Sequence, residues 1–221
     1  MCSTSTSTRK TTSSTTTEAA ADAAAEAVVS LLGDRARDHF LDMPPADPVS
    51  QANKAHEYVR LARRATEGDT PVSSAGGEQP KFTVFADTPA GARHLLVKFS
   101  LPDLNPITER WRDLLLAEHH ALETLASADM GAARSWIVDQ AGQRFLEVER
   151  FDRVGSSGRS SLFSLSALEA EFVGDAQAPW PVLVERLASQ RVVDAEAVRT
   201  TQALFAFGRL IGNSDMHAGN L

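Results

Sequence analysis

The chain has 221 residues, of which 43% are hydrophobic, and this is enough to form a domain with a buried core. Its formal net charge of −7 argues against general nucleic-acid binding, because neutralising phosphates requires a basic surface. A single cysteine, Cys2, excludes a disulfide framework, and the chain contains no run of about 18 apolar residues that could span a membrane. We therefore expect a cytoplasmic protein without nucleic-acid or membrane partners.

The first 71 residues are expected to precede the functional region. Residues 1–32 combine a disordered tail rich in serine and threonine with an alanine-rich helix that ends at Gly33. Residues 33–71 form a helical and extended lead-in. Within it, prolines mark an extended connection, and Ser50 is predicted to cap a helix over residues 51–65.

Residues 72–81 form a loop of mostly small residues that precedes a predicted strand at residues 82–86. Backbone N–H groups in such a loop can approach phosphate oxygens, because small side chains leave room. The loop matches neither the Walker A pattern nor the dinucleotide-binding glycine pattern, so by itself it is weak evidence. Its small residues are Ser73, Ser74, Ala75, Gly76 and Gly77.

A lysine and a glutamate on the next two predicted elements form a candidate ion pair. Residues 94–100 read as a strand with Leu95, Val97 and Phe99 on one face and Lys98 on the other. Glu118 falls inside the apolar stripe of a helix predicted over residues 108–126, where a carboxylate is costly unless it is paired. A strand lysine paired with a helix glutamate positions ATP in protein kinases. If each residue is considered alone, the alternative is that Lys98 is an ordinary surface lysine and Glu118 a solvated glutamate.

Adjacent histidines follow Glu118 on the same predicted helix. His119 and His120 point about 100° apart on a helix, so we expect that they do not bind one metal ion together.

Further along, residues 136–138 and 144–148 are predicted to form a hairpin, and residues 155–159 a turn or mobile loop.

The last part of the chain is predicted to be helical over residues 166–173, 181–188 and 194–210. The third helix is apolar nearly all round, with Leu210 and Ile211 at its end, so we expect it to be buried.

After Gly212, Asp215 and Asn220 stand five residues apart. In phosphotransferases with this spacing, the aspartate receives the proton of the attacking hydroxyl and the asparagine holds magnesium. In isolation the same spacing is common in turns.

Four segments occur in the order found in HipA-like serine/threonine kinases, the toxins of bacterial type II toxin–antitoxin systems. They are residues 73–81, 96–99, 148–153 and 213–220. The resemblance covers roughly residues 72–221 and implies an α+β, bilobal fold of the protein-kinase type. Residues 72–151 would form an N-lobe of antiparallel sheet plus helix, and residues 152–221 part of a helical C-lobe. The family also implies ATP and Mg²⁺, a protein substrate with a serine or threonine hydroxyl, and an antitoxin as a further partner.

The resemblance assigns roles by position. Lys98 is similar to the ATP-phosphate lysine, with Glu118 as its partner, and Asp215 to the catalytic base. Asn220 is similar to a magnesium ligand, and His217 to a loop histidine that is structural or lies near the phosphates.

Two further segments have counterparts in the family. Glu149, Arg150 and Phe151 resemble the segment between the lobes whose backbone meets the adenine. Ser73 stands where the family has a serine that can be autophosphorylated. A phosphate there would add nearly two negative charges beside the nucleotide and so eject the loop.

One kinase feature has no counterpart before Leu221, namely the second metal-binding aspartate downstream of the catalytic loop. We therefore expect the 221-residue chain to be a truncated form with weak or no activity. Two alternatives stay open. One is a non-catalytic module that sequesters an antitoxin or a substrate. The other is a small-molecule kinase of the aminoglycoside or choline kinase type, which shares the Asp-x-His-x-x-Asn pattern.

Overall fold

The structure is a computed structural model that describes residues 47–67, 79–156 and 158–221. It divides into two compact units, Met1–Ser160 and Ser161–Leu221, which are treated separately below. The predictions for residues 1–46 lie outside the described residues. So do those for the phosphate-loop residues Ser73, Ser74, Ala75, Gly76 and Gly77.

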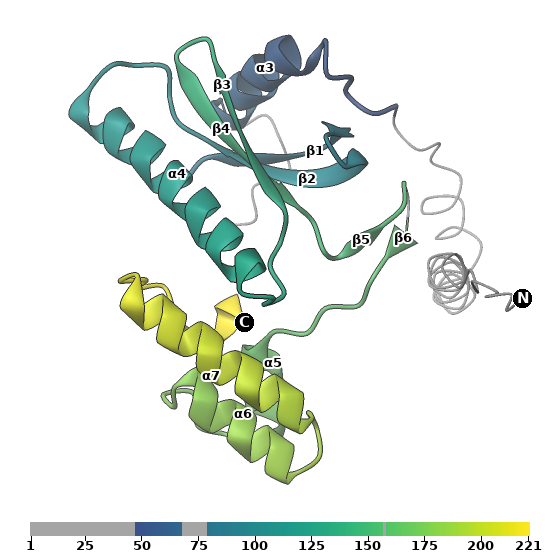
Figure 1. The fold of residues 1–221 in the computed structure, drawn as a ribbon, viewed down its shortest axis with the longest axis vertical. Helices are drawn as coiled ribbons and strands as arrows, with labels where there is room; N and C mark the ends of the chain where they lie inside the picture. Colours follow the sequence, from purple (N-terminus) through teal and green to yellow (C-terminus); the bar gives the residue numbers. More distant parts are fainter. Residues whose placement is uncertain (1–46, 68–78, 157) are drawn as a thin grey trace, which may run out of the picture. The chain divides into compact units, whose positions relative to one another are not determined.

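The first unit is built on a four-stranded antiparallel sheet in the order β1-β2-β4-β3 (Figure 1). Its strands are β1 (Lys81–Thr88), β2 (Gly91–Phe99), β3 (Ser135–Gln140) and β4 (Gln143–Glu149). The predicted strands and the predicted hairpin are confirmed. The hairpin turns at Ala141 and Gly142, whose φ angles of 50° and 75° are the positive values that a two-residue turn of this kind requires.

Two helices, α3 (Lys54–Thr66) and α4 (Pro106–Ser127), cover opposite faces of this sheet. Side chains alternate along β2, so its odd-numbered apolar residues face α3 while Lys98 faces α4. Helix α4 begins where the side chain of Asn105 accepts the backbone N–H groups of Ile107 and Thr108. The predicted cap of α3 is wrong: the Ser50 carbonyl accepts the N–H groups of Asn53 and Lys54, and the helix starts at Lys54.

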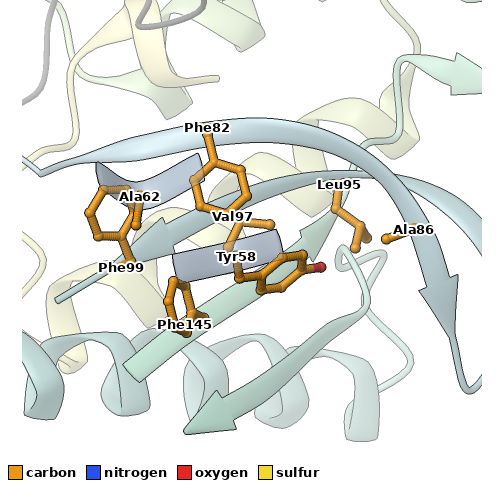
Figure 2. Close-up of a cluster of buried hydrophobic side chains, with 8 residues drawn as sticks. All are labelled: Tyr58, Ala62, Phe82, Ala86, Leu95, Val97, Phe99 and Phe145. Carbon is orange, nitrogen blue, oxygen red and sulfur yellow. The ribbon is translucent and has the colours of Figure 1, made fainter. Parts of the chain in front are cut away.

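The core of the first unit lies between α3 and the sheet and is mainly aromatic (Figure 2). Tyr58 packs edge-on against Phe82, with ring centroids 5.4 Å apart, and contacts Phe145 at 5.5 Å. Full burial of each large apolar side chain stabilises the fold by about 1.5–3 kcal/mol. The eight buried members are Tyr58, Ala62, Phe82, Ala86, Leu95, Val97, Phe99 and Phe145.

A buried polar cluster joins α3 to β4 at the edge of this core. Lys54 Nζ lies 2.8 Å from Glu147 Oε1, and the Tyr58 hydroxyl donates to the same oxygen at 2.6 Å. The side chains of Lys54 and Glu147 are only 3% and 1% exposed. Burial and the neighbouring Glu147 carboxylate raise the pKa of Tyr58. The cluster therefore attaches α3 to the sheet at one defined position.

A short ribbon of β5 (Arg153–Val154) and β6 (Gly158–Arg159) ends the first unit. The prediction of a turn or mobile loop at residues 155–159 is thus wrong for Gly158 and Arg159, which pair with β5. Position 158 favours glycine, because the Cβ of any other residue there would lie only 2.5 Å from the carbonyl oxygen of Val154.

The second unit consists of α5 (Leu165–Phe172), α6 (Trp180–Ser189), α7 (Ala195–Leu210) and the 3₁₀ turn η1 (Ala218–Asn220) (Figure 1). The three predicted helices are confirmed. They bury a core of Leu165, Trp180, Leu183, Val184 and Leu187. With the sheet of the first unit, they also confirm the predicted α+β class.

The expectation that α7 is buried is wrong. Leu210 is 84% exposed and Ile211 51%, whereas Phe205 packs against the core and Gly208 is buried. The second half of α7 is mostly apolar, but within this unit the neighbouring helix α6 covers only one side of it. Among the described residues, no helix combines the length and the apolar character that crossing a membrane would require.

Candidate active site

The predicted ion pair between Lys98 and Glu118 is present. Lys98 Nζ lies 2.7 Å and 2.9 Å from the two carboxylate oxygens of Glu118. The pair forms because β2 directs Lys98 away from the α3 core, and the stripe of α4 directs Glu118 toward the sheet beside buried Leu115. Both side chains are partly exposed, so the pair remains accessible from solvent.

This pair suits an anionic ligand. An ammonium group has three N–H donors, and two of those of Lys98 are directed at Glu118. Among the described residues the third has no acceptor, so it remains available for a phosphate oxygen. Glu118 at the same time holds the lysine in one orientation.

The segment after β4 is held by ion pairs of its side chains. Glu149 lies 2.7 Å from Arg134 and 3.1 Å from Arg93. The backbone N–H of Arg150 donates to the carbonyl of His94, and its guanidinium binds Asp152 and lowers the pKa of that carboxyl. Phe151 is largely exposed. The expected contact between this backbone and adenine stays a prediction.

In the second unit, hydrogen bonds bring Asp215 and Asn220 together. Helix α7 ends at Leu210, and Gly212, with a φ of 72°, lets the chain turn away from the helix, as predicted. The side chain of Asn213 then accepts the backbone N–H of Asp215 at 2.9 Å. The side-chain amide of Asn220 donates to the backbone carbonyl of Asp215, also at 2.9 Å. The five-residue spacing therefore closes into a compact loop.

His217 lies next to the Asp215 carboxylate. Its Nδ1 accepts the backbone N–H of Gly219 at 3.1 Å, so in the neutral ring the proton is on Nε2. Nε2 lies 3.4 Å from Asp215 Oδ1, which is longer than an ordinary hydrogen bond. A Cβ at position 219 would lie 3.0 Å from both Cε1 and Nδ1 of the ring, so a larger residue there would displace the ring.

The donor atoms of this loop fit magnesium. The Nδ2 of Asn220 donates to the backbone carbonyl of Asp215. Among the described residues no group donates a hydrogen bond to the Oδ1 of Asn220, so this oxygen is available to a metal ion. The Asp215 carboxylate is exposed and adds two further oxygens. Hard oxygen ligands of this kind are those that Mg²⁺ prefers. Lys98 and Glu118 belong to the first unit and the loop to the second, so their convergence on one nucleotide stays a prediction.

Two features of the second unit were missed from the sequence. A pocket of about 420 Å³ opens beside the loop, and Met216 anchors the loop to α7 by packing where Gly208 leaves room. A glycine within the mostly apolar second half of α7 was the available signal for this anchor. The pocket is lined mainly by Trp180, Phe205, Arg209, Asn213, Met216 and His217.

The adjacent histidines share a nearby carboxylate. His119 Nε2 and His120 Nδ1 both lie close to the carboxylate of Glu123, at 3.5 Å and 3.2 Å. All three potential ligand atoms lie within 4.8 Å of one another. The expectation that the two histidines do not bind one metal ion together considered only the angle between the two rings and not Glu123, one helical turn further on.

Comparison with known proteins adds two findings. The family model of the HipA-like C-terminal domain matches residues 73–221. The chain is also 45% identical over 179 residues to a protein of Escherichia coli (strain K12) named Toxin YjjJ. That alignment covers 80% of this chain but 40% of the relative, so the chain spans well under half of the relative's length.

Proposed function

Because this chain belongs to the family of HipA-like C-terminal domains, we propose that it forms part of an ATP-dependent kinase that phosphorylates serine or threonine hydroxyls of proteins. The observation that carries the proposal is the Lys98–Glu118 ion pair, at 2.7 Å and 2.9 Å. Such a pair between a sheet lysine and a helix glutamate orients the ATP phosphates in protein kinases. We propose a cytoplasmic location, where ATP is abundant.

Nucleotide binding is assigned to groups in the first unit, and magnesium binding to groups in the second. Lys98 donates its remaining N–H to a phosphate oxygen, and Glu118 keeps the ammonium in position. By their position in the family, residues 73–77 would contact the phosphates, and the backbone of Glu149, Arg150 and Phe151 would meet the adenine. Asn220, with the neighbouring Asp215 carboxylate, would hold Mg²⁺, which would neutralise phosphate charge.

Proton transfer is assigned to Asp215. As the substrate hydroxyl oxygen bonds to the γ-phosphorus, its proton passes to a carboxylate oxygen of Asp215, the bond to the β–γ bridging oxygen breaks, and ADP leaves. Nε2 of His217 lies 3.4 Å from Oδ1. A hydrogen bond from its N–H to Oδ1 during the reaction would orient the carboxylate and leave Oδ2 for the incoming proton. His217 is a positioning residue in this scheme.

The partners follow from the relative and the family. The Escherichia coli relative is named a toxin, so we propose an antitoxin as the regulatory partner of this protein, in addition to a protein substrate. Family membership favours this proposal over a small-molecule kinase of the aminoglycoside or choline type. A non-catalytic module that only sequesters a partner is the remaining alternative, and activity measurements distinguish it.

The test is phosphotransfer by the product of the complete reading frame. Incubation with γ-³²P-labelled ATP and Mg²⁺ is expected to label serine or threonine residues of the protein itself or of a protein substrate. Asp215→Asn should lower labelling by at least about 100-fold, because it removes the proton acceptor. Asp175→Asn is the control, since Asp175 is an exposed aspartate of the same unit that pairs with Arg186.

Equal labelling by the Asp215→Asn variant would remove the assignment of the base. Absence of labelling by the wild type, together with intact ATP binding, would favour the sequestering module. Absence of both would overturn the proposed function.

A further inference from the structure

We propose that His119, His120 and Glu123 of helix α4 form a second metal site, which binds a divalent transition-metal ion of the Zn²⁺ class. The site lies in the first unit and uses none of the groups assigned to phosphotransfer. Among the described residues, these three form the group whose potential ligand atoms lie close enough together to share one ion.

The distances from the Glu123 carboxylate to the two rings are close to those between ligand atoms of a tetrahedral ion. Zinc binds histidine nitrogen and carboxylate oxygen at about 2.0–2.2 Å, so two ligand atoms of a tetrahedral site lie about 3.3 Å apart. Glu123 Oε2 lies 3.2 Å from His120 Nδ1, and Glu123 Oε1 lies 3.5 Å from His119 Nε2. Small rotations of these side chains would place all three ligand atoms around one ion.

A neighbouring strand orients the first ligand. His119 Nδ1 lies 2.8 Å from the hydroxyl oxygen of Ser135, the first residue of β3. When this nitrogen donates to Ser135, the lone pair of Nε2 is left for the metal. Histidine ligands usually have such a second partner, which fixes the tautomer and the direction of the ring. The arrangement around His119 thus already has the form of a metal site.

The ligand set and the exposure together indicate the class of ion. Two imidazoles and one carboxylate form a ligand set that zinc enzymes use, with water in the fourth position. Magnesium and calcium prefer oxygen ligands throughout. The side chains of His120 and Glu123 are 63% and 59% exposed, so an ion can enter from solvent.

A bound ion would act on the helix that carries Glu118. It would join residues one turn apart on α4, and through Ser135 it would tie this turn to β3. Because His119 directly follows Glu118, the ion would stiffen the helix where Glu118 holds Lys98. The expected effect is higher thermal stability of the first unit in the presence of the ion.

The experiment is titration of the full chain, without a histidine tag, with Zn²⁺ in competition with a chromophoric chelator. A Cys2→Ser background is used, because a free thiolate also binds zinc. We expect one equivalent of Zn²⁺ per chain and an affinity at least about tenfold lower in His120→Ala and in Glu123→Ala. Both side chains are exposed, so both variants should keep the wild-type circular dichroism spectrum.

Two further variants separate a built site from general histidine binding. Ser135→Ala should weaken Zn²⁺ binding by about 10–100-fold, because it removes the group that orients His119. His56→Ala should leave binding unchanged, since His56 is an exposed histidine on α3. Zinc should raise the melting temperature of the wild type and not that of Glu123→Ala. The proposal is overturned if the wild type binds Zn²⁺ no more tightly than His120→Ala and Glu123→Ala.

Discussion

Replacement of Lys54 by methionine tests the buried polar cluster that joins α3 to the sheet. The substitution keeps a long apolar stem but removes the ammonium 2.8 Å from Glu147 Oε1. The Glu147 carboxylate, 1% exposed, then keeps the Tyr58 hydroxyl at 2.6 Å as its hydrogen-bond donor. Loss of one partner from a buried ion pair costs about 3–5 kcal/mol. Because Tyr58 continues to donate, we expect the lower end, about 3 kcal/mol.

The measurement is urea-induced unfolding followed by tryptophan fluorescence. Trp136 packs against the core cluster beside this ion pair and therefore reports on this unit. With a denaturant slope of about 1–3 kcal/mol per molar, a loss of 3 kcal/mol lowers the urea midpoint by about 1–3 M.

Two controls accompany this substitution. Arg60→Met, on the same helix, breaks a pair with Glu57 whose side chains are 40% and 25% exposed, so it should cost much less than Lys54→Met. The double variant Lys54→Met/Glu147→Gln removes the unpaired charge and keeps an acceptor for Tyr58, so it should recover much of the loss. The reasoning fails if Lys54→Met costs no more than Arg60→Met, or if the double variant recovers nothing.

Three further predictions concern the nucleotide, the core and the catalytic loop. Lys98→Ala should weaken ATP binding by about 1.5–3 kcal/mol, the range for a charge-assisted hydrogen bond, and unchanged affinity in calorimetry would count against its role. Tyr58 is the only tyrosine of the chain, and its pKa is raised by burial and Glu147. Its contribution to stability should therefore be complete below about pH 10, where a free tyrosine ionises, and be lost as the pH rises further. Absorbance at 295 nm should accordingly increase only together with unfolding, and ionisation of the folded protein near pH 10 would contradict this. Gly219→Ala should displace the His217 ring and lower phosphotransfer without changing the helical circular dichroism signal, whereas wild-type activity would show that the ring position is unimportant.

Local sequence patterns were sufficient to predict most elements and one contact of the candidate site. Alternation along β2 separates Lys98 from the apolar face of that strand, and the helical period of α4 puts Glu118 on the side that meets the sheet. Each pattern places a charged side chain where burial is costly without a partner of opposite charge. The pair at 2.7 Å could therefore be inferred from the two patterns together. The loop from Asn213 to Asn220 was equally readable, because hydrogen bonds between near neighbours in sequence close it.

The tertiary structure alone decided the contacts between distant elements and the exposure of their surfaces. Tyr58 and Glu147 meet although 89 residues separate them, and neither residue indicates the other in the sequence. The apolar end of α7 at Leu210 is exposed, although its composition predicted burial. Periodicity shows which face of an element is apolar or charged. Which other element covers that face depends on long-range packing, and the local pattern does not contain this information.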